Sequence, residues 1–295
     1  MSRLAFYFVD VFAEQKYSGN QLAVVDGGAS LSTAQMQDIA NEMHFPETTF
    51  IISHPQHQGG FDVRIFTPVT EVPFAGHPTL GTAYVIKHFI MKRRAVRDVL
   101  LNLKVGQIPV SFDKIGESQE IAWMKQMPPT FGKTFSVSQF IQILKLEAED
   151  FDNRYLIQEV STGLPFIIVP LKTLSAVRRA KIHRESLLEL AKEAKAGILV
   201  FCPETYNKGN DLNVRVFVDL FGIPEDPATG SGNGCLAGYL SRYRYFCTDH
   251  VNIRVEQGYE INRRSLMLLK AENKAGEICV YVGGKVVLVA SGKLM

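Results

Sequence analysis

A short apolar segment with a central arginine occurs twice in this chain. Residues 62–66 read Asp-Val-Arg-Ile-Phe, and residues 213–217, at an offset of 151, read Asn-Val-Arg-Val-Phe. Ala40, Glu42 and Phe50 match Ala191, Glu193 and Phe201 at the same offset. A chain built from two similar halves is expected to form two similar lobes, and a small-molecule site is expected in the cleft between them. Differences between the halves then indicate chemistry, because scaffold requirements affect both halves alike.

The composition is that of an ordinary globular protein with enough apolar residues for two cores. Of the 295 residues, 46% are hydrophobic and 21% are charged, with a net charge of +2. A dedicated nucleic-acid binder usually concentrates basic residues strongly, so we expect no nucleic-acid partner. Two basic clusters are interpreted as solvated helix ends, where cations complement the helix dipole. They contain Lys92, Arg93, Arg94 and Arg97, and Arg178, Arg179, Lys181 and Arg184.

Cysteine usage and the absence of long apolar runs favour a cytoplasmic protein without membrane contact. The four cysteines show no CxxC spacing, which favours free thiols in a reducing compartment. Residues 1–9 are better read as a strand than as a signal peptide. His54 and His57 lack a nearby carboxylate pair at ligand spacing, and no nucleotide-binding fingerprint is present. We therefore expect no metal and no cofactor.

Each half is expected to follow the same order of elements. A strand pair comes first, then an amphipathic helix, a buried strand, the duplicated arginine strand, and a glycine-rich loop that leads into an apolar helix. The expected first strand pairs are 5–12 with 21–25 and 120–125 with 166–169, and the expected final helices are 79–89 and 234–245. This order predicts a mixed α/β fold (α+β) with two pseudo-symmetric lobes, each a barrel-like sheet around one central helix.

The expected lobes are residues 1–116 and 117–283. A turn-rich break at residues 113–118 favours this boundary. The last strand, within residues 284–295, lies past the end of the second half and is expected to return to the first lobe.

Both glycine-rich loops lead into a helix N-terminus. Such a terminus presents unpaired backbone N–H groups and the positive end of the helix dipole. Glycines at 76 and 230 let an anion approach the backbone closely, so a small carboxylate or an enolate beside it could bind there. The alternative is that the glycines only permit tight turns and helix packing.

Three polar residues break the repeat. Glu47 lies before an apolar strand, and its partner at offset 151 is Ile198; Phe45 and Phe50 are expected to desolvate its carboxylate, which suits a proton shuttle. His77 stands where the second half has Ser231, and Asp226 precedes the second glycine-rich loop. The alternative is an exposed glutamate and a structural histidine. The chemistry these groups allow is cofactor-free proton transfer at a carbon next to a carboxylate or conjugated carbonyl.

The chain resembles the phenazine-biosynthesis PhzF-like isomerases, within the diaminopimelate epimerase-like fold. The motifs that carry the resemblance lie at residues 9–12, 18–21, 47–50, 66–79, 161–163 and 225–232. The resemblance implies a homodimeric isomerase that acts without a cofactor on a small anionic unsaturated or cyclic carboxylate. It implies that Glu47 shuttles the proton and that His77 and Asp226 assist. It also implies substrate contacts, which are Asn20, Gly76, Gly230 and Ser231.

The chain departs from the racemases and epimerases of the same fold, which use two opposed cysteines. Gly81 occupies the first loop-helix where a thiol would be needed, and Cys235 has no partner thiol. Two alternatives to the isomerase remain open at this point. One is a non-catalytic anion-binding or scaffold protein on the same fold, and the other is a one-base epimerase that uses Cys235.

Overall fold

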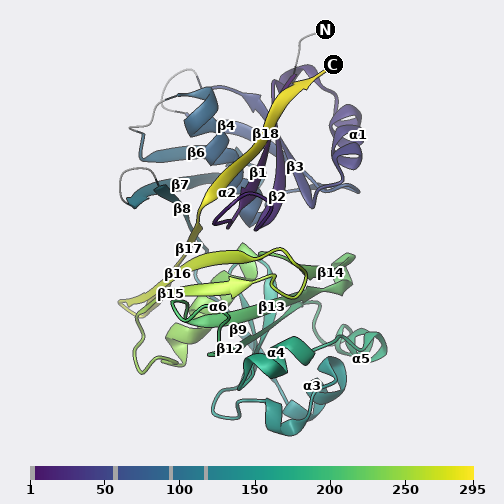
Figure 1. The fold of residues 1–295 in the computed structure, drawn as a ribbon, viewed down its shortest axis with the longest axis vertical. Helices are drawn as coiled ribbons and strands as arrows, with labels where there is room; N and C mark the ends of the chain where they lie inside the picture. The colour runs from purple at the N-terminus through teal and green to yellow at the C-terminus, as the bar shows by residue number, and fades with distance from the viewer. Residues whose placement is uncertain (1–3, 56–58, 93–95, 116–118) are drawn as a thin grey trace. The chain divides into compact units, whose positions relative to one another are not determined.

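The chain forms two compact units (Figure 1). The computed structural model describes residues 4–55, 59–92, 96–115 and 119–295. One unit comprises Met1–Met124 and Gly283–Met295, and the other comprises Lys125–Val282. The boundary expected at residues 116–117 lies outside the described residues, as do His57, Arg93 and Arg94.

The first unit contains one mixed sheet, in which most strands pair with the next strand along the chain, and one short strand pairs at its side. The pairing runs β18–β1–β2–β3–β4–β6–β7–β8, and β5 pairs with β4. The β2–β3 and β4–β6 pairs are parallel, whereas the other pairs are antiparallel. The bounds are β1 (Leu4–Val11), β2 (Asn20–Asp26), β3 (Glu47–Ser53), β4 (Phe61–Phe66), β5 (Glu71–Val72), β6 (Asp98–Leu103), β7 (Gly106–Ile115), β8 (Gln119–Lys125) and β18 (Val286–Leu294).

Helix α2 (Gly76–Val85) is surrounded by this sheet, which curves around it. It contacts β1, β2, β3, β6, β7 and β18, and almost all of its residues are buried. A Cβ at Gly81 would lie 2.5 Å from Leu22 and 2.9 Å from Val11. Only glycine therefore lets α2 lie this close to β1 and β2. The helix continues into a π-helical turn, η2 (Ile86–Ile90).

The outer face of the first sheet is covered by helix α1 (Thr33–Met43), which follows the short helix η1 (Gly28–Ser30). The Ser32 side chain accepts from the Gln35 N–H, and the Gln35 side chain accepts from the Ser32 N–H, so a capping box starts the helix. Met36 and Ala40 pack on Phe50 and Phe66 of the sheet. The 3.6-residue spacing of α1 thus produces a second, smaller core outside the sheet.

The second unit repeats this plan with more helices. Its strands pair in the order β9–β10–β11–β12–β13–β15–β16, with β14 added to β13. The bounds are β9 (Thr130–Phe135), β10 (Ile157–Ser161), β11 (Pro165–Pro170), β12 (Gly197–Cys202), β13 (Leu212–Val218), β14 (Ile223–Asp226), β15 (Val251–Gln257), β16 (Ser265–Lys274) and β17 (Glu277–Gly284).

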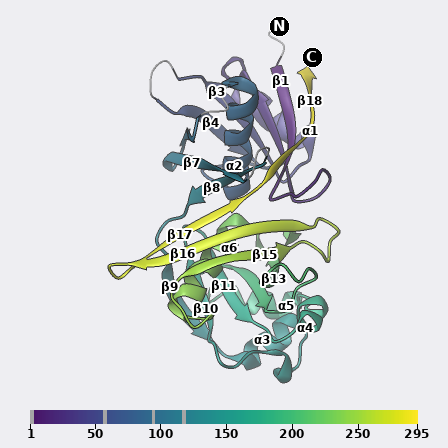
Figure 2. The ribbon, with the colours of Figure 1, turned by 60° about the vertical axis from the view of Figure 1, so that its left-hand side comes forward.

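Helix α6 (Gly230–Arg242) takes the place that α2 has in the first unit (Figure 2). It contacts β10, β11, β12, β15 and β16. The opposite face of the sheet packs on α3 (Val137–Leu144), α4 (Leu174–Arg179) and α5 (Arg184–Leu190), with Phe140 and Leu187 in that core. Two short helices, η3 (Ala148–Asp150) and η4 (Asp219–Phe221), complete the unit.

The expected architecture of two α/β lobes with sheets curved around central helices is confirmed. The expected return of the last strand is also found, because β18 pairs with β1. The prediction that residues 120–125 begin the second repeat was wrong: β8 pairs with β7, and the strand pair that corresponds to β1–β2 in the second unit is β10–β11. The two central helices begin earlier than expected, at Gly76 and Gly230, because each glycine already belongs to the first turn.

None of the helices within the described residues has the length and apolar character that crossing a membrane requires.

Candidate active site

Glu47 and His77 lie in contact in the first unit. The Glu47 Oε2 atom is 3.2 Å from His77 Nε2, and the side chains are 16% and 7% exposed. Glu47 is the first residue of β3, and His77 is the second residue of α2. The acid predicted to shuttle protons therefore lies beside the N-terminus of the central helix, next to the histidine that was predicted to assist it.

His77 is a neutral hydrogen-bond donor in this arrangement. Burial lowers the pKa of His77 to about 3, and this effect outweighs the hydrogen bond with the Gln21 carbonyl. The same Nε2 atom lies 3.3 Å from the Gln21 oxygen, which can only accept. Nε2 therefore carries the proton and donates it to the Gln21 oxygen, so a neutral imidazole lies next to Glu47 at neutral pH.

Glu47 is mostly buried, as expected, but Phe50 is not what buries it. Alternate residues of a strand face opposite sides of a sheet. Thr49 faces α2, with its hydroxyl 2.8 Å from that of Thr82, so Glu47 faces α2 as well. Phe50 lies on the other side of β3, where it packs edge-on against Phe66. The start of α2, rather than Phe50, is therefore what buries the carboxylate.

The counterpart of Glu47 in the second unit is Gly197, and the predicted counterpart Ile198 was wrong by one residue. Phe66 pairs with Thr48 in β3, whereas the equivalent Phe217 pairs with Ile198 in β12. A Cβ at Gly197 would lie 2.5 Å from the ring of Phe166. The phenylalanine ring therefore leaves no room for a carboxylate at that position of the second unit.

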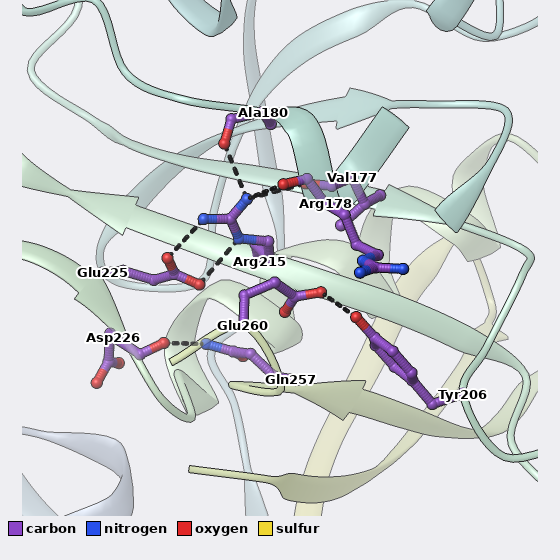
Figure 3. A network of polar contacts seen from close by, with 9 residues as sticks. All are labelled: Val177, Arg178, Ala180, Tyr206, Arg215, Glu225, Asp226, Gln257 and Glu260. Atoms are coloured by element: carbon purple, nitrogen blue, oxygen red, sulfur yellow. Dashed lines mark hydrogen bonds and ion pairs between the residues drawn. The ribbon is translucent and has the colours of Figure 1, made fainter. Parts of the chain in front are cut away.

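Asp226 is half-buried and lies within a hydrogen-bond network before helix α6 (Figure 3). Its Oδ2 accepts from the Thr229 hydroxyl at 2.5 Å, and its backbone oxygen accepts from Gln257 Nε2 at 2.7 Å. Gln257 Oε1 accepts from the Thr229 N–H at 3.2 Å and from Asn233 Nδ2 at 2.9 Å. Gln257 was not predicted as a site residue because nothing adjacent to it in the sequence resembles a motif.

An arginine–glutamate pair precedes each central helix. Arg64 donates twice to Glu71, both at 2.8 Å, and Arg215 donates twice to Glu225, at 3.0 and 2.7 Å. In the second unit Arg215 also donates to the carbonyl oxygens of Val177 and Ala180 at the end of α4 (Figure 3). Each pair ties the short strand before the helix to the duplicated strand.

These pairs were missed in the sequence although a signal was present. The arginines are 151 residues apart, whereas the glutamates are 154 apart. The second unit is longer by three residues between them, where η4 lies. Searching both offsets would have paired each arginine with a glutamate. Hydrogen bonds from Arg64 lower the pKa of Glu71 to about 2.

The residues expected to contact substrate lie at three positions of the fold. Gly76 and Gly230 are the first residues of α2 and α6, and Ser231 follows Gly230. Asn20 is fully buried at the start of β2. The structure thus brings Asn20 and Gly76 into the same unit as Glu47, and Ser231 into the same unit as Asp226. That the two sets serve one substrate stays a prediction.

Cys235 is a buried helix residue. Its Sγ lies 3.5 Å from the Leu164 carbonyl oxygen and 3.6 Å from the Thr162 hydroxyl. Burial raises the pKa of the thiol to about 11, so Cys235 is protonated at neutral pH and is a poor base. At the offset of 154 its counterpart is Gly81, where side-chain atoms of β1 and β2 leave no space for a thiol. This geometry disfavours thiol-based epimerisation.

No cluster of three or more metal-ligating side chains occurs among the residues that the structure describes. His54 Nε2 instead lies 2.8 Å from Asp26 Oδ1 at the surface.

The two units, each with a central helix that begins at a glycine, have the diaminopimelate epimerase-like fold. A probable proline racemase from Agrobacterium radiobacter shares this fold, with a TM-score of 0.61 at 10% identity over 99% of this chain and 93% of that chain. The sequence matches the phenazine biosynthesis-like protein family over residues 9–292. The chain belongs to this family.

Two relatives are similar over their whole length. The trans-2,3-dihydro-3-hydroxyanthranilate isomerase of Pseudomonas aeruginosa is 31% identical over 292 residues, which cover 98% of each chain. The crystal structure of a PhzF-family phenazine biosynthesis protein from Bacillus anthracis has a TM-score of 0.90 at 27% identity and covers 100% of both chains. The chain is therefore a PhzF-like isomerase by family, which confirms the resemblance found in the sequence.

Proposed function

We propose that this protein is a cofactor-independent isomerase that moves a proton within a small anionic, unsaturated or cyclic carboxylate. The observation that carries the proposal is the contact between the mostly buried carboxylate of Glu47 and the neutral imidazole of His77. The contact is built from two different elements and has no equivalent at Gly197 in the other unit. A carboxylate in such surroundings is suited to general acid–base work.

In the proposed reaction Glu47 removes a proton from a carbon next to the conjugated system and returns it to another carbon. The electron pair left behind spreads into the conjugated carboxylate as an enolate. The backbone N–H groups at Gly76 and Gly230 and the Ser231 hydroxyl are proposed to hold that charge. His77, as a neutral imidazole beside Glu47, is proposed to keep the carboxylate in position, and Asp226 is proposed to orient the substrate. Atoms and charges balance because the proton only changes its carbon.

The relative from Pseudomonas aeruginosa suggests the first compound to test, trans-2,3-dihydro-3-hydroxyanthranilate. The protein is incubated in deuterated water with this compound and with a panel of small unsaturated carboxylates, and deuterium incorporation is followed by mass spectrometry. Exchange reports proton abstraction even where the product is unknown.

The Glu47→Gln variant tests the role of the acid. We expect exchange to fall by about a hundredfold or more while the fold is kept, since a positioned acid–base group contributes about 10²–10⁴ to the rate. Glu42→Gln is the matched control, because Glu42 is an exposed glutamate on α1. Full exchange activity in Glu47→Gln would remove Glu47 from the mechanism. Ligand binding without any exchange by the wild type would favour the non-catalytic anion-binding protein.

A further inference from the structure

The polar network at Asp226 exists in only one of the two units. The offset of 154 places Val72 and Ala75 at the positions of Asp226 and Thr229. Strand register supplies the third counterpart. Asp62 pairs with Asn102 in β6, and the equivalent Asn213 pairs with Glu256 in β15, so Leu103 corresponds to Gln257. Three polar residues of the second unit thus replace apolar residues of the first.

Helix initiation does not explain this difference. In the first unit the Thr79 N–H and hydroxyl both bond to the Ala75 carbonyl oxygen, at 3.3 and 2.7 Å. In the second unit the Asn233 N–H and Nδ2 both bond to the Thr229 carbonyl oxygen, at 3.0 and 3.1 Å. Both helices therefore begin with the same local bonds. The additional contacts from Gln257 serve something other than the start of a helix.

Gln257 uses both ends of its amide within this network. Its Oε1 accepts twice, and its Nε2 donates to the Asp226 backbone oxygen at 2.7 Å and to Thr229 Oγ1 at 3.0 Å. Because Thr229 Oγ1 accepts this hydrogen bond, its own proton is directed to Asp226 Oδ2, 2.5 Å away. Gln257 and Thr229 are 0% and 8% exposed, so both side chains are largely shielded from water.

We propose that Gln257 and Thr229 are positioning residues for Asp226. Gln257 holds the Asp226 backbone and sets the direction of the Thr229 proton, and Thr229 in turn holds Oδ2 as an acceptor. A hydrogen bond donated to a carboxylate favours its ionised form. We call this series of hydrogen bonds, from Gln257 through Thr229 to Asp226, the relay. The relay keeps Asp226 in one orientation and in its ionised state. This inference rests on the proposed function only in that Asp226 is taken to act on the substrate.

Two matched variants of Thr229 test the relay by kinetics. Thr229→Val keeps the shape and removes the donor, whereas Thr229→Ser keeps the hydroxyl. We expect the exchange rate kcat to fall about tenfold or more in Thr229→Val with KM changed less than about threefold, and we expect Thr229→Ser to restore most of the rate. A purely structural role would instead give parallel losses in Thr229→Val and Thr229→Ser, and this result would overturn the proposal.

The Gln257→Met variant tests the first step of the relay. Gln257→Met should lower kcat as much as Thr229→Val does. In the double variant Gln257→Met with Thr229→Val, kcat should be no less than about half that of either single variant, because both substitutions remove the same interaction. Multiplied losses in the double variant would show two independent contributions and would contradict the relay.

A titration that needs no substrate separates this inference from the proposed function. The side-chain carboxyl carbons of aspartate are labelled with ¹³C, the Asp226 signal is assigned with Asp226→Asn, and its midpoint is followed by NMR against pH. We expect the midpoint to rise by about one pH unit in Thr229→Val and in Gln257→Met, and not in Thr229→Ser. If the Asp226 titration curves of Thr229→Val and Gln257→Met superimpose on that of the wild type, the relay is refuted. Absence of deuterium exchange by the wild type would refute the isomerase proposal alone.

Discussion

His77 shows how one buried residue links the site to the stability of the first unit. Its folded pKa is about 3, because burial disfavours the charged imidazole, whereas an unfolded histidine titrates near 6.5. Between these values the unfolded chain binds a proton that the native state does not, so the free energy of unfolding falls as the pH falls below 6.5.

We therefore expect acidification from pH 7 to pH 5 to destabilise the wild type by about 2 kcal/mol more than His77→Gln. Urea denaturation at both pH values measures this difference. His250→Gln, which changes an exposed histidine, is the control and should follow the wild type. If His77→Gln and the wild type lose equal stability, the imidazole is not held neutral in the folded protein.

At the residue scale, the sequence predicted that Glu47 and His77 belong to one site, and the two side chains are in contact, but it did not predict how they are held. Glu47 and His77 could be predicted because each breaks the repeat beside a glycine-rich loop. Gln257 could not be predicted, because it is 31 residues from Asp226 in the sequence and only the pairing of β15 with β13 brings the two residues together. The cause of burial at Glu47 was also hidden, since it depends on which face of β3 the side chain occupies.

At the scale of elements, the two arginine–glutamate pairs have the same connectivity but different burial. The side chains of Arg215 and Glu225 are 10% and 9% exposed, whereas those of Arg64 and Glu71 are 28% and 14% exposed. Glu71 also contacts Lys104 at 2.7 Å. Removing one partner of a buried pair leaves an uncompensated charge, which is more costly than loss of an exposed pair.

We accordingly expect Glu225→Gln to lower the free energy of unfolding by about 3 kcal/mol and Glu71→Gln by about 1 kcal/mol. The two variants remove the same charge from equivalent positions, so each is the control for the other. Denaturant unfolding followed by circular dichroism measures both. A larger loss in Glu71→Gln would mean that burial does not determine the strength of these pairs.

The elements themselves were predictable where periodicity or a glycine-rich loop marks them. Apolar residues at helical spacing predicted α1, and the glycine-rich loops predicted the starts of α2 and α6 to within a few residues. The prediction for strand β8 was wrong because an apolar segment does not indicate which strand it pairs with. Only the β7–β8 register, which joins Val110 to Met124, resolves that ambiguity.

At the scale of the whole molecule, the duplicated segment in the sequence was enough to predict two units of one plan. The last strand adds a connection that the repeat alone does not contain. All eight residues of β1 pair with β18, from Leu4 with Leu294 to Val11 with Val286. Strand β1 is therefore a central strand with β2 on its other side, and the first unit is complete only when the last ten residues are present.

Removal of residues 286–295 tests this dependence. The loss of an eight-residue ladder is on the order of 5 kcal/mol, since each net hydrogen bond contributes about 0.5–1.5 kcal/mol, and this is comparable to the whole stability of a domain. We expect the first unit of the truncated chain to be digested by a protease while residues 125–282 resist. Removal of Met295 alone, which is 99% exposed, is the control. Equal protease resistance of residues 4–115 in both chains would show that β1 needs no partner on that side.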